Sequence, residues 1–221
     1  MNLLKWKFTY PVTVLFALLL MADLGFALVH VVYKFNYLSH PHFSIDRDGS
    51  YAEVYQYLKE FWIVCLLLLI AVREKAVIYL AWAFIFLYML ADDSMRIHEM
   101  VGGILTRSYQ LQPVFGLRAQ DIGELLITGL VAAVLFSFLF LAYYFASPTA
   151  RRVTHYLLLL VAGIAFFGIV VDMLHVALPW GKSLFALIED GGEMAIMSLV
   201  VGYCFSLLYR HSPALQANSV R

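Results

Sequence analysis

Long apolar stretches alternate with short polar connections along the whole chain. Six of them extend over about 20 residues or more, the length that an α-helix needs to cross the hydrocarbon core of a bilayer. They lie at about 10–34, 54–72, 76–100, 121–146, 155–178 and 184–209. Only Arg73, Glu74 and Lys75 separate the second stretch from the third, which indicates a tight helical hairpin. We therefore predict an all-α protein, a bundle of six transmembrane helices in which residues 1–221 form a single transmembrane domain.

The composition supports a membrane protein and excludes several other classes. Of the 221 residues, 63% are hydrophobic and 14% are charged, whereas soluble domains average about 45–50% and about 25%. Lys plus Arg and Asp plus Glu both number 15, so the chain has no basic field for nucleic acid. No Walker-type loop occurs, which argues against a nucleotide ligand. The expected partners are the lipid bilayer and either another membrane protein or further copies of the chain.

An even number of spans places both termini on one side of the membrane. Eight Lys and Arg residues fall on that side and seven on the other. Arg151 and Arg152 lie in the short connection between the fourth and fifth spans. Because cytoplasmic loops are enriched in Lys and Arg, we predict cytoplasmic termini.

The acidic residues and histidines gather on the opposite side. Fourteen of the fifteen Asp and Glu residues and five of the seven histidines fall there. At 1.5 Å per residue, Asp23, Asp92, Asp172 and Glu193 lie about 20–26 Å from the inner ends of their spans. The hydrocarbon core is about 30 Å thick, so these groups are submerged beneath one membrane surface. This convergence predicts a shared interior pocket near the extracytoplasmic face.

The spacing of these residues favours a metal site. Asp92, Arg96 and Glu99 would share one helical stripe, and Asp172 and His175 would lie one turn apart on one face. Packed helices that each contribute a carboxylate or a histidine build metal sites in bundles. Such ligands suit Fe, Mn or Zn as a divalent metal cofactor. The predicted metal ligands are His98, Glu99, Glu124, Asp172, His175, Glu189 and Glu193. Residues expected to orient them are Asp92, Asp93, Arg96, Asp121 and Asp190.

Several functions remain open at this stage. A divalent metal with an open coordination position would permit hydrolytic or oxidative chemistry on a lipid-like or small substrate, so the protein could be a metal-dependent membrane enzyme. The alternatives are a non-catalytic subunit of a membrane complex and a cation or proton transporter. In a transporter, Asp23 and His30 would belong to a proton or ion path. The simplest alternative is that charges at the helix ends meet water singly, or pair as Asp92 and Arg96 would.

Two stretches carry a resemblance to a known group. The first is the acidic loop from Phe43 to Glu60, which leads into the second span, and the second is Asp92-Asp-Ser-Met-Arg-Ile-His-Glu99. Together they resemble a group of uncharacterised bacterial multi-pass membrane proteins with an Asp-Asp-x-x-Arg-Ile-His-Glu motif. The resemblance covers roughly residues 40–130. It implies a location in the bacterial inner (plasma) membrane and implies no activity.

Overall fold

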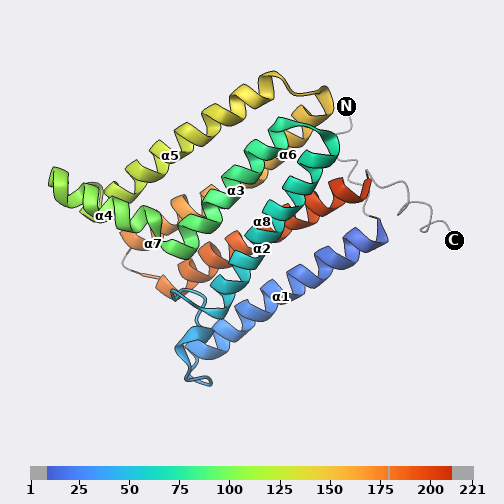
Figure 1. The fold of residues 1–221 in the computed structure, drawn as a ribbon. Coiled ribbons are helices and arrows are strands. Elements are labelled where there is room, and N and C mark those ends of the chain that lie inside the picture. Colours follow the sequence, from blue (N-terminus) through green and yellow to red (C-terminus); the bar gives the residue numbers. More distant parts are fainter. Residues whose placement is uncertain (1–8, 179, 211–221) are drawn as a thin grey trace.

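The computed structural model describes residues 9–178 and 180–210 (Figure 1). Its elements are α1 (Tyr10–Lys34), η1 (Pro41–Phe43), α2 (Tyr51–Glu74), α3 (Val77–Met95), α4 (Ile97–Tyr109), α5 (Ala119–Tyr144), α6 (Pro148–Ala165), η2 (Phe166–Val171), α7 (Asp172–Ala177) and α8 (Lys182–Arg210). Six helices are long and apolar enough to cross a membrane, when α6, η2 and α7 are taken as one helix over Pro148–Val176. The predicted all-helical, multi-pass architecture is therefore confirmed.

Local sequence signals explain where several helices begin. Ser50 precedes α2 and accepts a hydrogen bond from the backbone N–H of Glu53 at 3.1 Å. Ser147 precedes α6 and accepts from the N–H of Ala150 at 3.3 Å. Each serine satisfies one of the donors that a helix N-terminus leaves unpaired. The fifth span therefore begins earlier than the 155 predicted from hydrophobicity, because Ser147 caps a polar first turn.

The third span is shorter than predicted because the chain bends at Arg96. This residue adopts φ 54° and ψ 45°, a left-handed conformation that ends α3 at Met95. The next helix, α4, starts at Ile97 and packs against the first part of α5. The predicted helical stripe of Asp92, Arg96 and Glu99 is wrong for the same reason, since no single helix contains all three.

The hydrophobic core lies where α2, α3 and α8 pack together. Leu67, Trp82, Phe86, Val200 and Cys204 are fully buried there. Because lipid tails are as apolar as these side chains, the bundle is held by close packing and by hydrogen bonds between helices. One such bond runs from the indole Nε1 of Trp82 to the hydroxyl of Thr154 on α6, over 3.2 Å.

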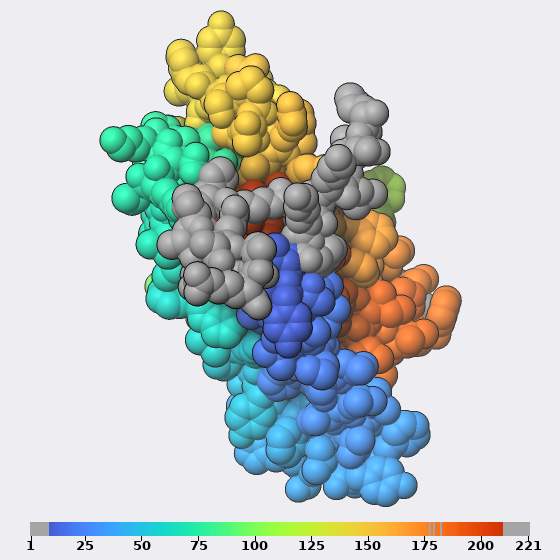
Figure 2. Space-filling model, turned by 90° about the vertical axis from the view of Figure 1, so that its right-hand side faces the viewer, coloured from blue at the N-terminus to red at the C-terminus, as the bar shows by residue number. Residues whose placement is uncertain are grey.

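The bundle has two different ends. At one, which we call the turn end, lie the start of α1, the α2–α3 and α5–α6 turns and the last residues of α8 (Figure 1). Figure 2 looks onto the turn end, with α1 in blue, the α2–α3 turn in green and the α5–α6 turn in gold. The other end, which we call the loop end, carries the α1–α2 loop, α4 and α7 (Figure 1). Tyr10 and Arg210 thus share one end, as an even number of spans requires, and the cytoplasmic assignment of that end stays a prediction.

Candidate functional site

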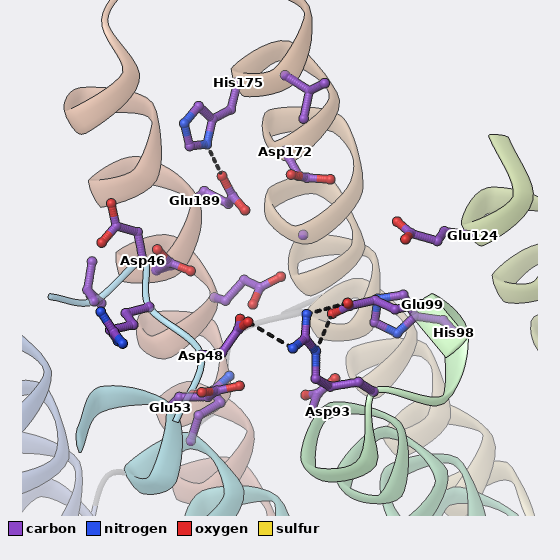
Figure 3. A pocket seen from close by; sticks show the side chains of 18 of the residues that line it. Asp46, Asp48, Glu53, Asp93, His98, Glu99, Glu124, Asp172, His175 and Glu189 are labelled. Atoms are coloured by element: carbon purple, nitrogen blue, oxygen red, sulfur yellow. Dashed lines mark hydrogen bonds and ion pairs between the residues drawn. The ribbon is translucent and has the colours of Figure 1, made fainter. Parts of the chain in front are cut away.

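A cleft of about 930 Å³ opens at the loop end of the bundle. Its walls come from the α1–α2 loop, α2, the α3–α4 bend, α5, the η2–α7 segment and α8 (Figure 3). The volume falls in the range of about 300–1,000 Å³ that is typical of small-molecule sites. Carboxylates dominate its surface. The acidic residues that line it are Asp46, Asp48, Glu53, Asp93, Glu99, Asp121, Glu124, Asp172, Glu189, Asp190 and Glu193.

Positive charge along the same walls is sparse. Only Arg47, Arg96 and Arg118 line the cleft among the described cationic side chains, together with His98 and His175. Arg96 pairs with Asp48 at 2.9 Å and also bonds Glu99 (Figure 3). These arginines are too few to neutralise the carboxylates around them. The cleft therefore attracts cations, and a low-dielectric wall strengthens that attraction.

One wall is organised by the bend after α3. The carboxylate of Asp92 accepts from the backbone N–H of His98 at 2.8 Å and contacts the ring Nδ1 of His98 at 2.9 Å. The hydrogen bond to Asp92 raises the pKa of His98, against the opposing effect of burial. This contact holds the imidazole by one nitrogen. The other nitrogen, Nε2, makes no hydrogen bond to any residue that the structure describes.

The facing wall repeats the arrangement with different helices. Nδ1 of His175, on α7, lies 2.9 Å from the carboxylate of Glu189, on α8 (Figure 3). Asp172 stands one turn before His175 and lines the same side of the cleft. The contact with Glu189 orients the imidazole of His175, and the role of Glu189 as a metal ligand stays a prediction. A carboxylate at Nδ1 of a histidine is the usual outer partner of a metal-binding imidazole.

The floor of the cleft carries acidic groups from two helices, with a third acidic group buried behind them. Glu193 on α8 and Asp93 on α3 line it, and both are electrostatic neighbours of Glu60 on α2. Glu60 is fully buried, and neither of its carboxylate oxygens has a well-formed hydrogen bond among the described residues. Gly168, in the π-helical segment η2, leaves the space that the Glu193 carboxylate occupies, since a Cβ there would overlap it.

Close helix contact also depends on glycine on the α4 side. A Cβ on Gly102 would lie 2.7 Å from the backbone nitrogen of Glu124, so α4 and α5 approach closely at this point. The contact brings His98 and Glu99, at the start of α4, to the same cleft as Glu124. Asp121 is held by Arg118, with 2.6 Å between the guanidinium and the carboxylate, and caps the start of α5.

The α1–α2 loop closes the cleft from the α1 side. Asp46 pairs with Lys34 at 2.8 Å and accepts from Ser44. Burial opposes ionisation of Asp46, but its hydrogen bonds to Lys34 and Ser44 outweigh this and lower the pKa of the carboxyl. His30 is buried beneath the loop, and its Nδ1 accepts from the backbone N–H of Ile45 at 2.9 Å. His30 therefore anchors the loop.

Asp23 lies below the cleft in an ion pair. The Lys59 ammonium is 3.0 Å from Asp23 and also donates to the carbonyl oxygen of Met194 at 2.8 Å. Ser198 donates to the second oxygen of Asp23 at 2.5 Å. Neither Asp23 nor His30 lines the cleft. Their role in an ion path stays a prediction.

The structure thus brings all seven predicted ligands to the lining of one cleft. Among residues 9–178 and 180–210, no three His, Cys, Asp or Glu side chains are grouped so that they could hold a metal ion as they stand. Sequence reasoning gave no role to Lys59 or Glu60. Their position beside a long apolar run was the available signal, because ionisable groups within a span are rare and usually functional.

These features define a multi-pass helical membrane protein with an acid-lined cleft at one end of its bundle. The chain belongs to a family described as a domain of unknown function (DUF8692), which matches residues 12–207. No curated protein and no solved structure matches it significantly.

Proposed function

We propose that the protein binds a divalent metal ion in the acid-lined cleft, between the wall of His98 and the wall of His175. The observation that carries the proposal is the repeated histidine–carboxylate pair, with Asp92 at Nδ1 of His98 and Glu189 at Nδ1 of His175. Such a pair fixes the ring and leaves Nε2 as the ligand atom. Imidazole and carboxylate together suit Fe, Mn or Zn.

The carboxylates beside each histidine complete the candidate ligand set. Glu99 and Glu124 lie on the His98 side of the cleft and Asp172 lies on the His175 side (Figure 3), while Glu193 lines the floor. Binding would draw ligands from the two walls toward one ion. The α4 wall is joined to the bundle through the bend at Arg96, which gives it a natural hinge. Binding of the metal would therefore narrow the cleft.

The direct test is metal binding by the purified protein in detergent. We expect the protein stripped with EDTA to bind Mn²⁺ or Zn²⁺ stoichiometrically in calorimetry, and to contain one of these metals or Fe when isolated without chelator. The double variant H98A/H175A should bind at least tenfold more weakly. His155→Ala is the matched control, since His155 lies near the α5–α6 turn and contacts Tyr143 at 2.9 Å. Equal binding by the wild type and by H98A/H175A would contradict the proposal.

The size of the cleft favours a second candidate, an organic polycation. At about 930 Å³ the cleft far exceeds the space of one ion, and its carboxylates are spread over all walls. A linear polyamine could pair with several of them at once. Calorimetry with spermidine tests this candidate. Binding of spermidine that Asp48→Asn and Glu99→Gln each weaken, together with no binding of Mn²⁺ or Zn²⁺, would favour the polycation over the metal.

A further inference from the structure

A second cavity, of about 1170 Å³, lies between α3 and α5 and reaches the start of α6. Its walls are apolar, with Phe84 and Leu87 on α3 facing Phe138 and Leu141 on α5. All four are exposed, Phe84 and Phe138 to 61% and 65%. Small residues, Ala81 and Ala142, also line it. We call this cavity the α3–α5 groove.

The groove runs along the membrane-spanning part of the bundle. Its lining extends from Lys75 to Ala91 on the α2–α3 side, which is about 24 Å of helix. The hydrocarbon core is about 30 Å thick, so most of the groove lies at the depth of lipid tails. Helices in a membrane cannot leave such a gap empty, because the side chains that line it would lose their packing partners. An apolar chain must fill it.

One mouth of the groove is polar and lies at the turn end. Glu74, Lys75, Ser147 and Thr149 line it there. Lys75 is exposed in a left-handed conformation after the last turn of α2. The turn end also carries Arg73, Arg151 and Arg152, and Glu74 is its one described acidic residue. This end therefore attracts an anionic group, in contrast to the acidic loop end.

We propose that the α3–α5 groove binds a membrane phospholipid, with its acyl chains against Phe84 and Phe138 and its phosphate beside Lys75. The apolar walls match the tails, and the excess of basic residues at the turn end matches the charge of the headgroup. A second copy of the chain fits less well. Both copies would have the same orientation in the membrane, so their basic turn ends would lie side by side at one surface and repel each other. This site is separate from the acidic cleft and does not depend on its proposed ligand.

The test is native mass spectrometry of the full chain, released from membranes in a mild detergent. We expect one or two phospholipids to remain bound to each wild-type chain. Ala81→Phe and Ala142→Phe together fill the groove and should lower the retained lipid at least tenfold. Ala133→Phe is the matched control, because Ala133 is exposed on α5 outside the groove. Circular dichroism and size-exclusion chromatography show that each variant is folded.

The headgroup contact is tested by Lys75→Glu. It should lower retention of anionic phospholipids several-fold more than that of zwitterionic ones. Arg152→Glu makes the same charge change at the turn end outside the groove and should change this ratio little. A lipid-free wild type, equal retention by A81F/A142F, or a lipid-free dimer that A81F/A142F converts to a monomer would overturn the proposal. The last result would assign the groove to contact between copies.

Discussion

The ammonium of Lys59 and the carboxylate of Asp23 form an ion pair inside the helical bundle, 3.0 Å apart, with Lys59 fully buried. The pair joins α2 to α1, and the bonds to Met194 and Ser198 join both helices to α8. These contacts lie just beneath the acid-lined cleft. They hold together α2 and α8, which contribute lining residues to the cleft, and α1, whose following loop closes it.

Removing one partner of this pair should destabilise the fold strongly. Lys59→Met leaves the Asp23 carboxylate buried without its counter-charge, and loss of one partner of a buried pair costs about 3–5 kcal/mol. Thermal or denaturant unfolding in detergent measures the loss. The double variant D23L/K59M should recover much of the stability, because both charges are then absent.

An exposed ion pair provides the control. Lys34 and Asp46 lie 2.8 Å apart, with about a third of each side chain exposed. Lys34→Ala should cost under about 1 kcal/mol, as exposed pairs usually do. Equal losses for Lys34→Ala and Lys59→Met would show that the Lys59 pair does not stabilise the bundle.

Glu60 should behave in the opposite way to Asp23. Both carboxyl groups are buried near Lys59, but Glu60 faces the acidic side chains of Asp93 and Glu193. Glu60→Gln supplies an amide that can donate to the neighbouring carboxylates without the cost of burying a charge, so we expect it to raise the free energy of unfolding by about 1–3 kcal/mol. Asp23→Asn, the matched variant, should lower it. Destabilisation by both variants would mean that Glu60 has a stabilising partner.

The close approach of α4 and α5 predicts a contrast between two adjacent glycines. Gly102→Ala places a Cβ against the backbone of Glu124, whereas Gly103 has open space. We expect Gly102→Ala to destabilise by about 1–3 kcal/mol through overpacking. Gly103→Ala should be neutral or stabilise by up to about 1 kcal/mol, because alanine favours the helix. Thermal unfolding of the two variants, side by side, checks the packing of α4 on α5.

The His98–Asp92 contact predicts a pH dependence of stability. The hydrogen bond to Asp92 raises the pKa of His98 in the folded state above its ordinary value of about 6.5. The contact therefore stabilises the fold fully below about pH 6.5, and this contribution is lost as the pH rises through the raised pKa. Unfolding measured in EDTA should show that the free energy of unfolding falls as the pH rises above about 6.5. His98→Gln should flatten the slope, and an unchanged slope would contradict the assignment.

Much of the fold could be predicted because the apolar runs are long. α1 begins and ends where the hydrophobic pattern does, at Tyr10 and Lys34. The boundaries of other helices depended on polar contacts that periodicity does not show. Met95 ends α3 because Arg96 turns left-handed and Asp92 bonds forward to His98. No hydrophobic pattern specifies that bend.

The residues that line the cleft could be predicted from the sequence, but the contacts between them could not. The sequence places the acids and histidines on one side of the membrane, and this was enough to predict that His98 and His175 line one cleft. Ionisable groups within spans collect where they can share solvent or partners. Which carboxylate meets which imidazole depends on helix rotation. Glu189 therefore reaches His175 across α7 and α8, although Asp172 is the nearer residue in the chain.

The π-helical turn over Phe166–Val171 determines which residues of the following helix face Glu189. A π turn holds one residue more than an α turn, and each residue of an α-helix rotates the chain by about 100°. If this segment were wound as a regular α-helix of the same length, Asp172 and His175 would turn by about 100° round the helix axis and away from the cleft. The π winding of this segment, independently of its side chains, keeps one wall of the cleft facing the other.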